Sequence, residues 1–245
     1  MSLIRHSELP LIAGPLYWLA EPQEGLMESV YQHEPDPSPE YLFDQTPWSR
    51  LREQGPLLFR LSERGGLLAA LREDPGRLNG ILLIGSSSPD EVLSHLRALL
   101  HVDFGQQRKA IMRYYDPVVA SYLWPAVSSE ELPRWMGPLR QIFWFGGTWA
   151  DRAEQSLSWH EVLQVSAKET SAGLPVFNLS ESQQTALARQ GVERFAFDWL
   201  NNHSAEPFAR LIRRIEQGLA VGHDEQDTLS AWLEDPASQL MEHHG

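Results

Sequence analysis

The sequence predicts a mixed fold of the α/β or α+β class, in which an N-terminal lobe of strands and helices precedes a small all-helical lobe. In the first part of the chain, short apolar runs alternate with segments of helical periodicity. Beyond about residue 165 only the helical periodicity remains. We therefore assign residues 1–165 to the mixed lobe and residues 166–245 to the helical lobe.

The mixed lobe begins with elements that alternate in type. They are a strand at 16–19, a helix at 25–32, a loop with prolines at 35, 37 and 39, a strand at 56–61 and a helix at 66–74. Pro56 stands at the first position of its strand, where its missing N–H costs no ladder bond.

The most apolar run is LNGILLIG at 78–85, which predicts a central strand buried on both faces. The helix after it has the clearest start in the chain. Ser88 is its expected N-cap, Pro89 its first residue and Glu91 the acidic residue of its first turn. Apolar residues then recur on one helical face, so we expect this helix to cover the sheet.

The rest of the mixed lobe is predicted to contain a strand at 110–115, short helices at 118–124 and 129–136, and a strand at 141–144 that could turn back through Gly146 and Gly147. The strand at 110–115 should end at Asp116 and Pro117, since proline cannot donate to a ladder.

The stretch VSAKETSAGLP at 165–175 is small and polar, and we interpret it as a linker. Ser180 and Gln183 form a capping box at the start of the first helix beyond it. Apolar stripes at helical spacing predict three helices, and the last is expected to end at Asp235 and Pro236.

The amino-acid composition disfavours several classes of function. The net charge of −13 disfavours nucleic acids and anionic membranes, and favours protein partners with basic patches, although acid excess also serves solubility. The absence of cysteine excludes thiol nucleophiles, cysteine zinc sites and iron–sulfur clusters. Pro10 and Pro15 interrupt the uncharged N-terminal run, so we expect no signal peptide and a cytoplasmic protein without a membrane span.

Catalytic patterns are sparse. His160 and Glu161 provide the first half of a zinc-protease helix, but Gln164 replaces the second histidine. The spacing of Asp103, Asp116 and Asp151 pairs no two carboxylates. We therefore expect no cofactor, no metal and no catalytic residue. Asp116 is the best single acid candidate, although an aspartate before proline typically caps the following helical turn.

The nine tryptophans are spread along the chain, which favours a core role for most of them. A tryptophan near a loop also suits a protein-binding surface. Trp149 and Trp159 are our candidates for partner anchors because they flank the expected junction of the lobes.

Three stretches together resemble a known family. They are YLFDQTPWSRLREQGPLLFRLS, NGILLIGSSSPDEVLSHLRALLHV and AIMRYYDPVVASYLWPAVSSEELPRWMGPLRQIFW, and the signature within them is Arg113, Tyr114, Tyr115, Asp116 and Pro117. In order and spacing they are similar to the type VI secretion effector adaptors, the chaperones called Tap or TEC, long catalogued as a domain of unknown function. The resemblance covers roughly residues 16–144, and it departs from the family at Asn79, where an aromatic residue is expected.

This resemblance implies a non-enzymatic, cytoplasmic protein that binds a secreted toxic effector and loads it onto the VgrG spike. It also implies that the signature at 113–117 is structural. The alternative is a carbohydrate-binding or hydrolytic enzyme that uses Asp116 and nearby aromatic residues.

Overall fold

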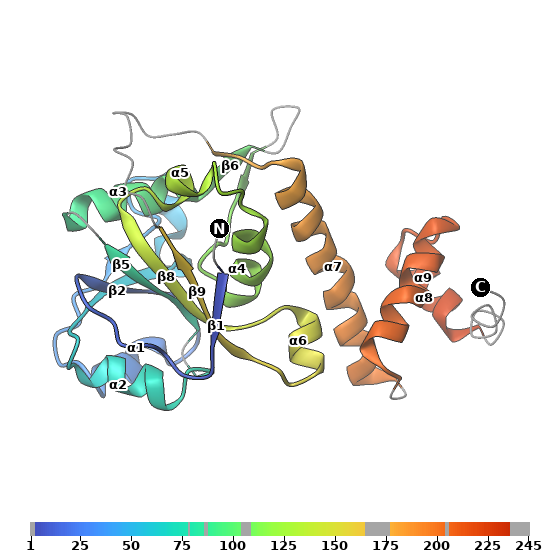
Figure 1. The fold of residues 1–245 in the computed structure, drawn as a ribbon, viewed down its shortest axis with the longest axis horizontal. Helices are drawn as coiled ribbons and strands as arrows, with labels where there is room; N and C mark the ends of the chain where they lie inside the picture. Colours follow the sequence, from blue (N-terminus) through green and yellow to red (C-terminus); the bar gives the residue numbers. More distant parts are fainter. Residues whose placement is uncertain are drawn as a thin grey trace. The chain divides into compact units, whose positions relative to one another are not determined.

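The computed structural model describes residues 3–77, 79–85, 88–103, 109–164, 177–203 and 206–235. The chain divides into two compact units. The sheet unit comprises Met1–Gly147 and Leu157–Leu187, and the helical unit comprises Thr148–Ser156 and Ala188–Gly245. The predicted mixed fold with a helical C-terminal region is confirmed (Figure 1).

The core of the sheet unit is a seven-stranded sheet in the order β1-β9-β8-β5-β2-β4-β3. Its strands are β1 (Leu3–His6), β2 (Leu16–Ala20), β3 (Glu40–Tyr41), β4 (Leu57–Leu61), β5 (Gly80–Gly85), β8 (Leu139–Gly146) and β9 (Ser158–Leu163). Every neighbouring pair is antiparallel, which selects α+β from the two predicted classes. As predicted, the apolar strand β5 occupies the centre and is buried.

Helices cover both faces of this sheet (Figure 1). On one face, α1 (Leu26–Tyr31) and α2 (Gly66–Glu73) pack against apolar side chains of β2, β4 and β5. On the other face lie α3 (Pro89–Leu99), α4 (Pro117–Leu123) and α5 (Leu132–Met136). The alternation along β2 explains the two layers, because Trp18 points into the first cluster and Tyr17 into the second.

Shorter elements complete the sheet unit. They are the 3₁₀ helices at Ser49–Gln54 and Trp124–Ala126, and a small sheet in the order β10-β6-β7, made of β6 (His101–Asp103), β7 (Lys109–Ile111) and β10 (Phe177–Asn178). The predicted strand at 110–115 is therefore too long. It ends at Ile111, and the N–H of Asp116 donates to the carbonyl of Arg113, which closes a turn.

The predicted turn after β8 needs correction. Strands β8 and β9 do pair antiparallel, but α6 (Trp149–Ala153) lies between them in the chain instead of a tight glycine turn. His160 and Glu161 lie on strand β9, so the partial zinc-protease motif, which the sequence already left without its second histidine, is not on a helix either.

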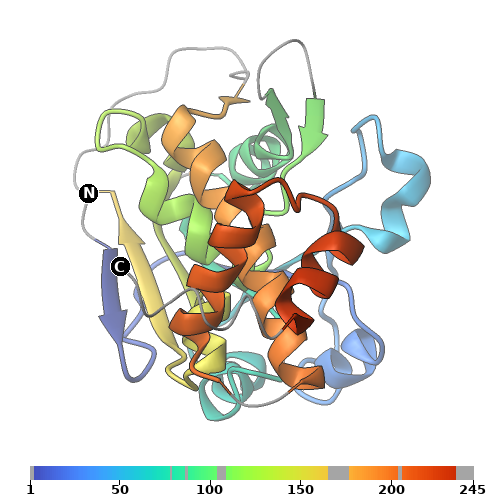
Figure 2. The ribbon, with the colours of Figure 1, turned by 90° about the vertical axis from the view of Figure 1, so that its right-hand side faces the viewer.

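The three predicted C-terminal helices are present as α7 (Glu181–Asn202), α8 (Phe208–Ala220) and α9 (Gln226–Glu234), and the helical unit contains α8, α9 and the part of α7 from Ala188 onward. The predicted capping box is present, because the N–H of Gln183 donates to Ser180 Oγ and the N–H of Ser180 donates to Gln183 Oε1. Helices α8 and α9 lie side by side (Figure 2). Buried Phe208, Leu211 and Ile215 of α8 pack with Leu229 and Leu233 of α9.

The break between the compact units falls within α7 and not at residue 165. Residues beyond 165 belong to the sheet unit because Phe177 is buried in its core and β10 pairs with β6. Ser182 Oγ also donates to the carbonyl of Ala126. The predicted linker at 165–175 lies outside the described residues. Within the described part of the chain, no helix combines the length and apolar character needed to cross a membrane.

Gly80, at the first position of β5, is a position where only glycine fits. Its φ is 149°, and a Cβ there would lie 2.4 Å from the carbonyl oxygen of Leu19 and 2.6 Å from Trp18 Nε1. We expect Gly80→Ala to lower the free energy of unfolding by roughly 3 kcal/mol or more, because backbone strain and overpacking add.

Urea denaturation measures this loss, and Gly25→Ala is the matched control. Gly25 also has a positive φ, of 73°, but its Cβ would contact only the flexible Glu28 carboxylate, at 3.4 Å. Equal losses in the two variants would contradict the role assigned to the close approach at Gly80.

Candidate functional site

The signature at 113–117 forms the turn that connects β7 to α4. Asp116 is the N-cap of α4, and its Oδ1 accepts a hydrogen bond of 2.8 Å from the N–H of Val118. Pro117 is the first residue of the helix, where a missing N–H costs nothing. Asp116 therefore caps the helix as the sequence predicted.

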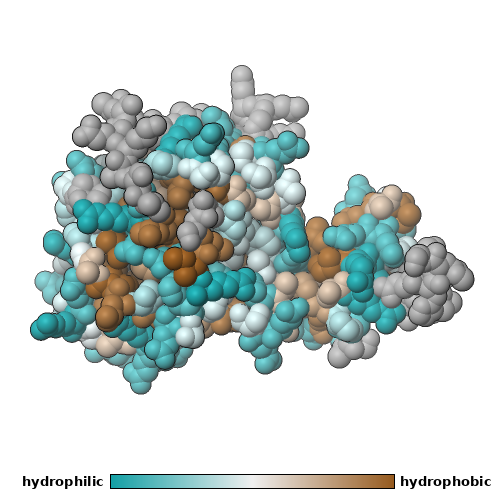
Figure 3. All heavy atoms as spheres, viewed as in Figure 1, coloured by the Kyte–Doolittle hydropathy of each residue, from teal (hydrophilic) through white to brown (hydrophobic). Residues whose placement is uncertain are grey.

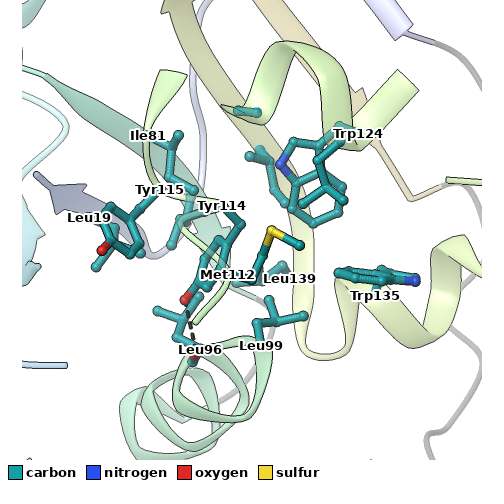
Figure 4. Packing of buried hydrophobic residues seen from close by; sticks show 14 of the residues in the cluster. Leu19, Ile81, Leu96, Leu99, Met112, Tyr114, Tyr115, Trp124, Trp135 and Leu139 are labelled. Carbon is teal, nitrogen blue, oxygen red and sulfur yellow. Dashed lines mark hydrogen bonds between the residues drawn. The ribbon is translucent and has the colours of Figure 1, made fainter. Parts of the chain in front are cut away.

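Tyr114 anchors this turn to α3. Its side chain is fully buried, and its hydroxyl donates a hydrogen bond of 2.8 Å to the carbonyl of Leu96 (Figure 4). Around the ring lie apolar side chains from the sheet and from α3, as Figure 4 shows. Burial raises the pKa of Tyr114 well above its usual value, so the phenol stays a neutral donor.

Tyr115 packs edge-on against Tyr114, with ring centroids 5.8 Å apart. Its pKa is raised to about 12, first by burial and further by the charges of Glu21 and Asp116, against the effect of Arg113. Neither phenol can therefore act as a proton acceptor or nucleophile near neutral pH, since both remain protonated there.

Arg113 joins the turn to the end of β2. Its guanidinium pairs with Glu21, the residue after β2, and lies 3.5 Å from Asp116 Oδ2. Burial disfavours the charge of Arg113, but Glu21 and Asp116 together hold its pKa above the usual value. Arg113 thus forms ion pairs with Asp116 and with Glu21, and the three side chains make a triad.

Glu21 is the residue of this triad that the sequence did not reveal. Burial raises the pKa of its carboxyl, the charge of Asp116 raises it further, and Arg113 opposes both effects. Its N–H donates to the carbonyl of Asn79, at the position where the sequence departs from the adaptor pattern. An acidic residue immediately after the fully buried strand LYWLA was the available signal.

A chain of hydrogen bonds continues from the signature into the sheet. Ser121 Oγ donates to the carbonyl of Pro117 at 2.8 Å, and Trp144 Nε1 donates to Ser121 Oγ at 2.8 Å. The indole of Trp144 on β8 stacks on His160 of β9, with ring centroids 5.1 Å apart. The turn is therefore connected through side chains to α3, α4, β2 and β8.

The contacts of the signature turn are those of a structural connection between elements. The hydroxyl of Tyr114, the guanidinium of Arg113 and both carboxylate oxygens of Asp116 have partners inside the sheet unit. The other acid candidates lie elsewhere. Asp103 is on β6, and Asp151 forms a capping box with Thr148 at α6. In the described ranges, no three histidine, aspartate or glutamate side chains are placed to hold a metal ion.

The structure places the two candidate anchors, Trp149 and Trp159, in different surroundings. Trp159 on β9 is 4% exposed and packs in the apolar cluster of the sheet beside Phe145, so the expectation that it is accessible is wrong. Trp149 of α6 is half-buried, and its ring lies 5.1 Å from that of Phe197. Its role as a partner anchor stays a prediction, and truncating it would also remove packing within the helical unit.

Comparison with known proteins gives one match. Residues 16–134, just under half of the chain, match a family model described as Domain of unknown function (DUF4123). The matched span contains the whole signature turn and the central strand β5. No curated protein and no solved structure matches the chain.

Removing the helix cap at Asp116 should destabilise the protein. We expect Asp116→Ala to lower the free energy of unfolding by about 0.5–2 kcal/mol. Asp116→Asn should lose less, because asparagine also caps helices. Chemical denaturation measures both losses. Equal losses for alanine and asparagine would contradict the capping role and assign the effect to the charge beside Arg113.

The raised pKa of Glu21 predicts a pH dependence of stability. The folded state holds the carboxyl proton of Glu21 more tightly than the unfolded state does. The contribution of Glu21 to the free energy of unfolding is therefore fully present below pH 4.5, the ordinary pKa of this carboxyl. It is lost as the pH rises through the raised pKa of the folded protein. The stability of the wild type relative to Glu21→Gln should therefore fall as the pH rises across this interval.

Urea titrations of wild type and Glu21→Gln at several pH values from below 4.5 to neutral give this difference directly. Asp103→Asn is a suitable control for a carboxyl outside the triad. Curves for wild type and Glu21→Gln that run parallel over the whole interval would refute the linkage.

Proposed function

We propose that this protein is a cytoplasmic adaptor that binds a type VI secretion effector and loads it onto the VgrG spike. The observation that carries the proposal is the signature turn. Its five residues resemble those of the adaptor family in order and spacing, and their polar atoms serve internal bonds. An adaptor requires a stable scaffold at this position and no chemistry.

The surface supports a protein-binding role. On the face seen in Figure 3, apolar residues of the sheet unit gather in a patch bordered by polar ones. Such patches are typical of sites that bind other proteins. The net charge of −13 favours a partner with basic segments and disfavours nucleic acid.

Loading is tested in the native host with a candidate type VI effector of that host. We expect the effector to co-purify with the adaptor, and we expect deletion of the adaptor to abolish effector secretion while secretion of the spike continues. Asp116→Asn, which keeps the cap, should restore secretion to the deletion strain.

The rival proposal of an enzyme is tested with purified protein. Purified wild-type protein would be incubated with bacterial cell-wall glycan and with soluble oligosaccharides, and the products separated by chromatography. Turnover that disappears in Asp116→Asn, while the melting temperature is unchanged, would replace the adaptor proposal with the hydrolase.

A further inference from the structure

A groove opens in the sheet unit between the proline-rich loop before β3, the end of β4 and the start of α3. It encloses about 640 Å³. Leu58 and Leu61 of β4 line it together with Leu93 of α3, and Leu61 and Leu93 are half-exposed. The groove therefore has a mixed lining, in which the partly exposed Leu61 and Leu93 lie among polar and charged side chains.

A break in the edge ladder explains why the groove exists. Strand β3 pairs with β4 only at Glu40↔Leu58 and Tyr41↔Leu57. Ser38, between Pro37 and Pro39, has a φ of 35° and so leaves the extended region that a strand requires. The loop consequently leaves β4 after two residue pairs, and it forms the wall opposite Arg60 and Leu61.

The rim of this groove is acidic. Glu34, Asp36 and Glu40 line the loop side and Asp90 lines the helix side, whereas Arg60 is the cation among the lining residues. Within the described residues, none of these four carboxylates has an ion-pair partner. Their charge is therefore available to a ligand.

The spacing of these carboxylates decides the kind of ligand. Among the described residues no three acidic or histidine side chains converge as a metal site requires. The charges are instead distributed around an apolar floor, an arrangement that suits several separated cations on one chain. Phosphate-bearing ligands are disfavoured by the same charges.

We propose that the groove binds an extended segment of the partner protein in which basic residues alternate with apolar ones. The apolar side chains would lie on Leu61 and Leu93, and the basic side chains would reach the rim. This inference deepens the adaptor proposal, on which it rests, by naming the chemistry of the effector segment that is bound.

The test uses a synthetic peptide of alternating lysine and leucine and the same peptide with glutamate in place of lysine. The full-length protein is titrated with each by calorimetry. We expect the lysine peptide to bind, with an affinity that falls as salt is added, and the glutamate peptide not to bind. Equal binding of the two peptides would overturn the proposal.

The rim is tested by the variant Glu34→Gln/Asp36→Asn/Glu40→Gln. The loss of three ionic contacts of the strength usual at a protein surface predicts roughly tenfold weaker binding of the lysine peptide. The control Glu24→Gln/Glu130→Gln/Glu154→Gln removes the same charge at exposed positions outside the groove, and its affinity should match that of the wild type. If the two triple variants lose the same affinity for the lysine peptide, the effect comes from net charge alone, and the proposal that the groove binds the peptide is refuted.

Arg60→Glu provides a test in the opposite direction, because it adds negative charge to the groove and should tighten lysine-peptide binding. An unchanged or weaker affinity would count against the proposal.

Measurements of effector binding distinguish the adaptor proposal from the proposal that the groove is the binding site. If the effector binds wild type and the rim variant alike, the adaptor role stands and the groove is not its site. If the peptide results hold but the effector neither binds nor depends on this protein for secretion, the groove stands and the adaptor proposal falls.

Discussion

The packing of the turn after β7 against α3 depends on the hydrogen bond from the hydroxyl of Tyr114 to the carbonyl of Leu96. The same turn starts α4 through Asp116. Arg113 ties this turn to the end of β2 through Glu21. A buried phenol is costly without a partner, so the bond favours one arrangement of these elements over alternatives of similar apolar burial. The signature is conspicuous in the sequence because one turn must satisfy all these contacts.

The local elements could be predicted well where one segment contains its own signals. The apolar run of β5, the cap of α3 at Ser88 and the capping box of α7 at Ser180 and Gln183 are such cases. Side-chain periodicity and capping act within a few residues, so the sequence displays them directly. The same holds for Asp116, whose capping partner is two residues away.

What escaped prediction depends on partners distant in the sequence. Strand β1 is short and forms only by pairing with β9, and the ladder joins Leu3 to Val162. Glu21 gains its role from Arg113, 92 residues further on. Trp159 was expected at the surface because it lies near a loop, but its alternation on β9 points it into the sheet's apolar cluster. Periodicity within one segment contains no information about which strand will be its neighbour.

Prolines lie at two kinds of position in this fold, at the starts of helices and beside the turn that shapes the groove. At the first turn of α3 and of α4 the missing N–H has no helical partner in any case, so Pro89 and Pro117 begin helices without cost. Beside β4 the ladder ends after two residue pairs, where Ser38, between Pro37 and Pro39, leaves the extended region with a φ of 35°. A continued ladder would bring the loop against Arg60 and Leu61 and close the space between them. The turn at Ser38 thus leaves Leu61 and Leu93 partly exposed beside acidic side chains.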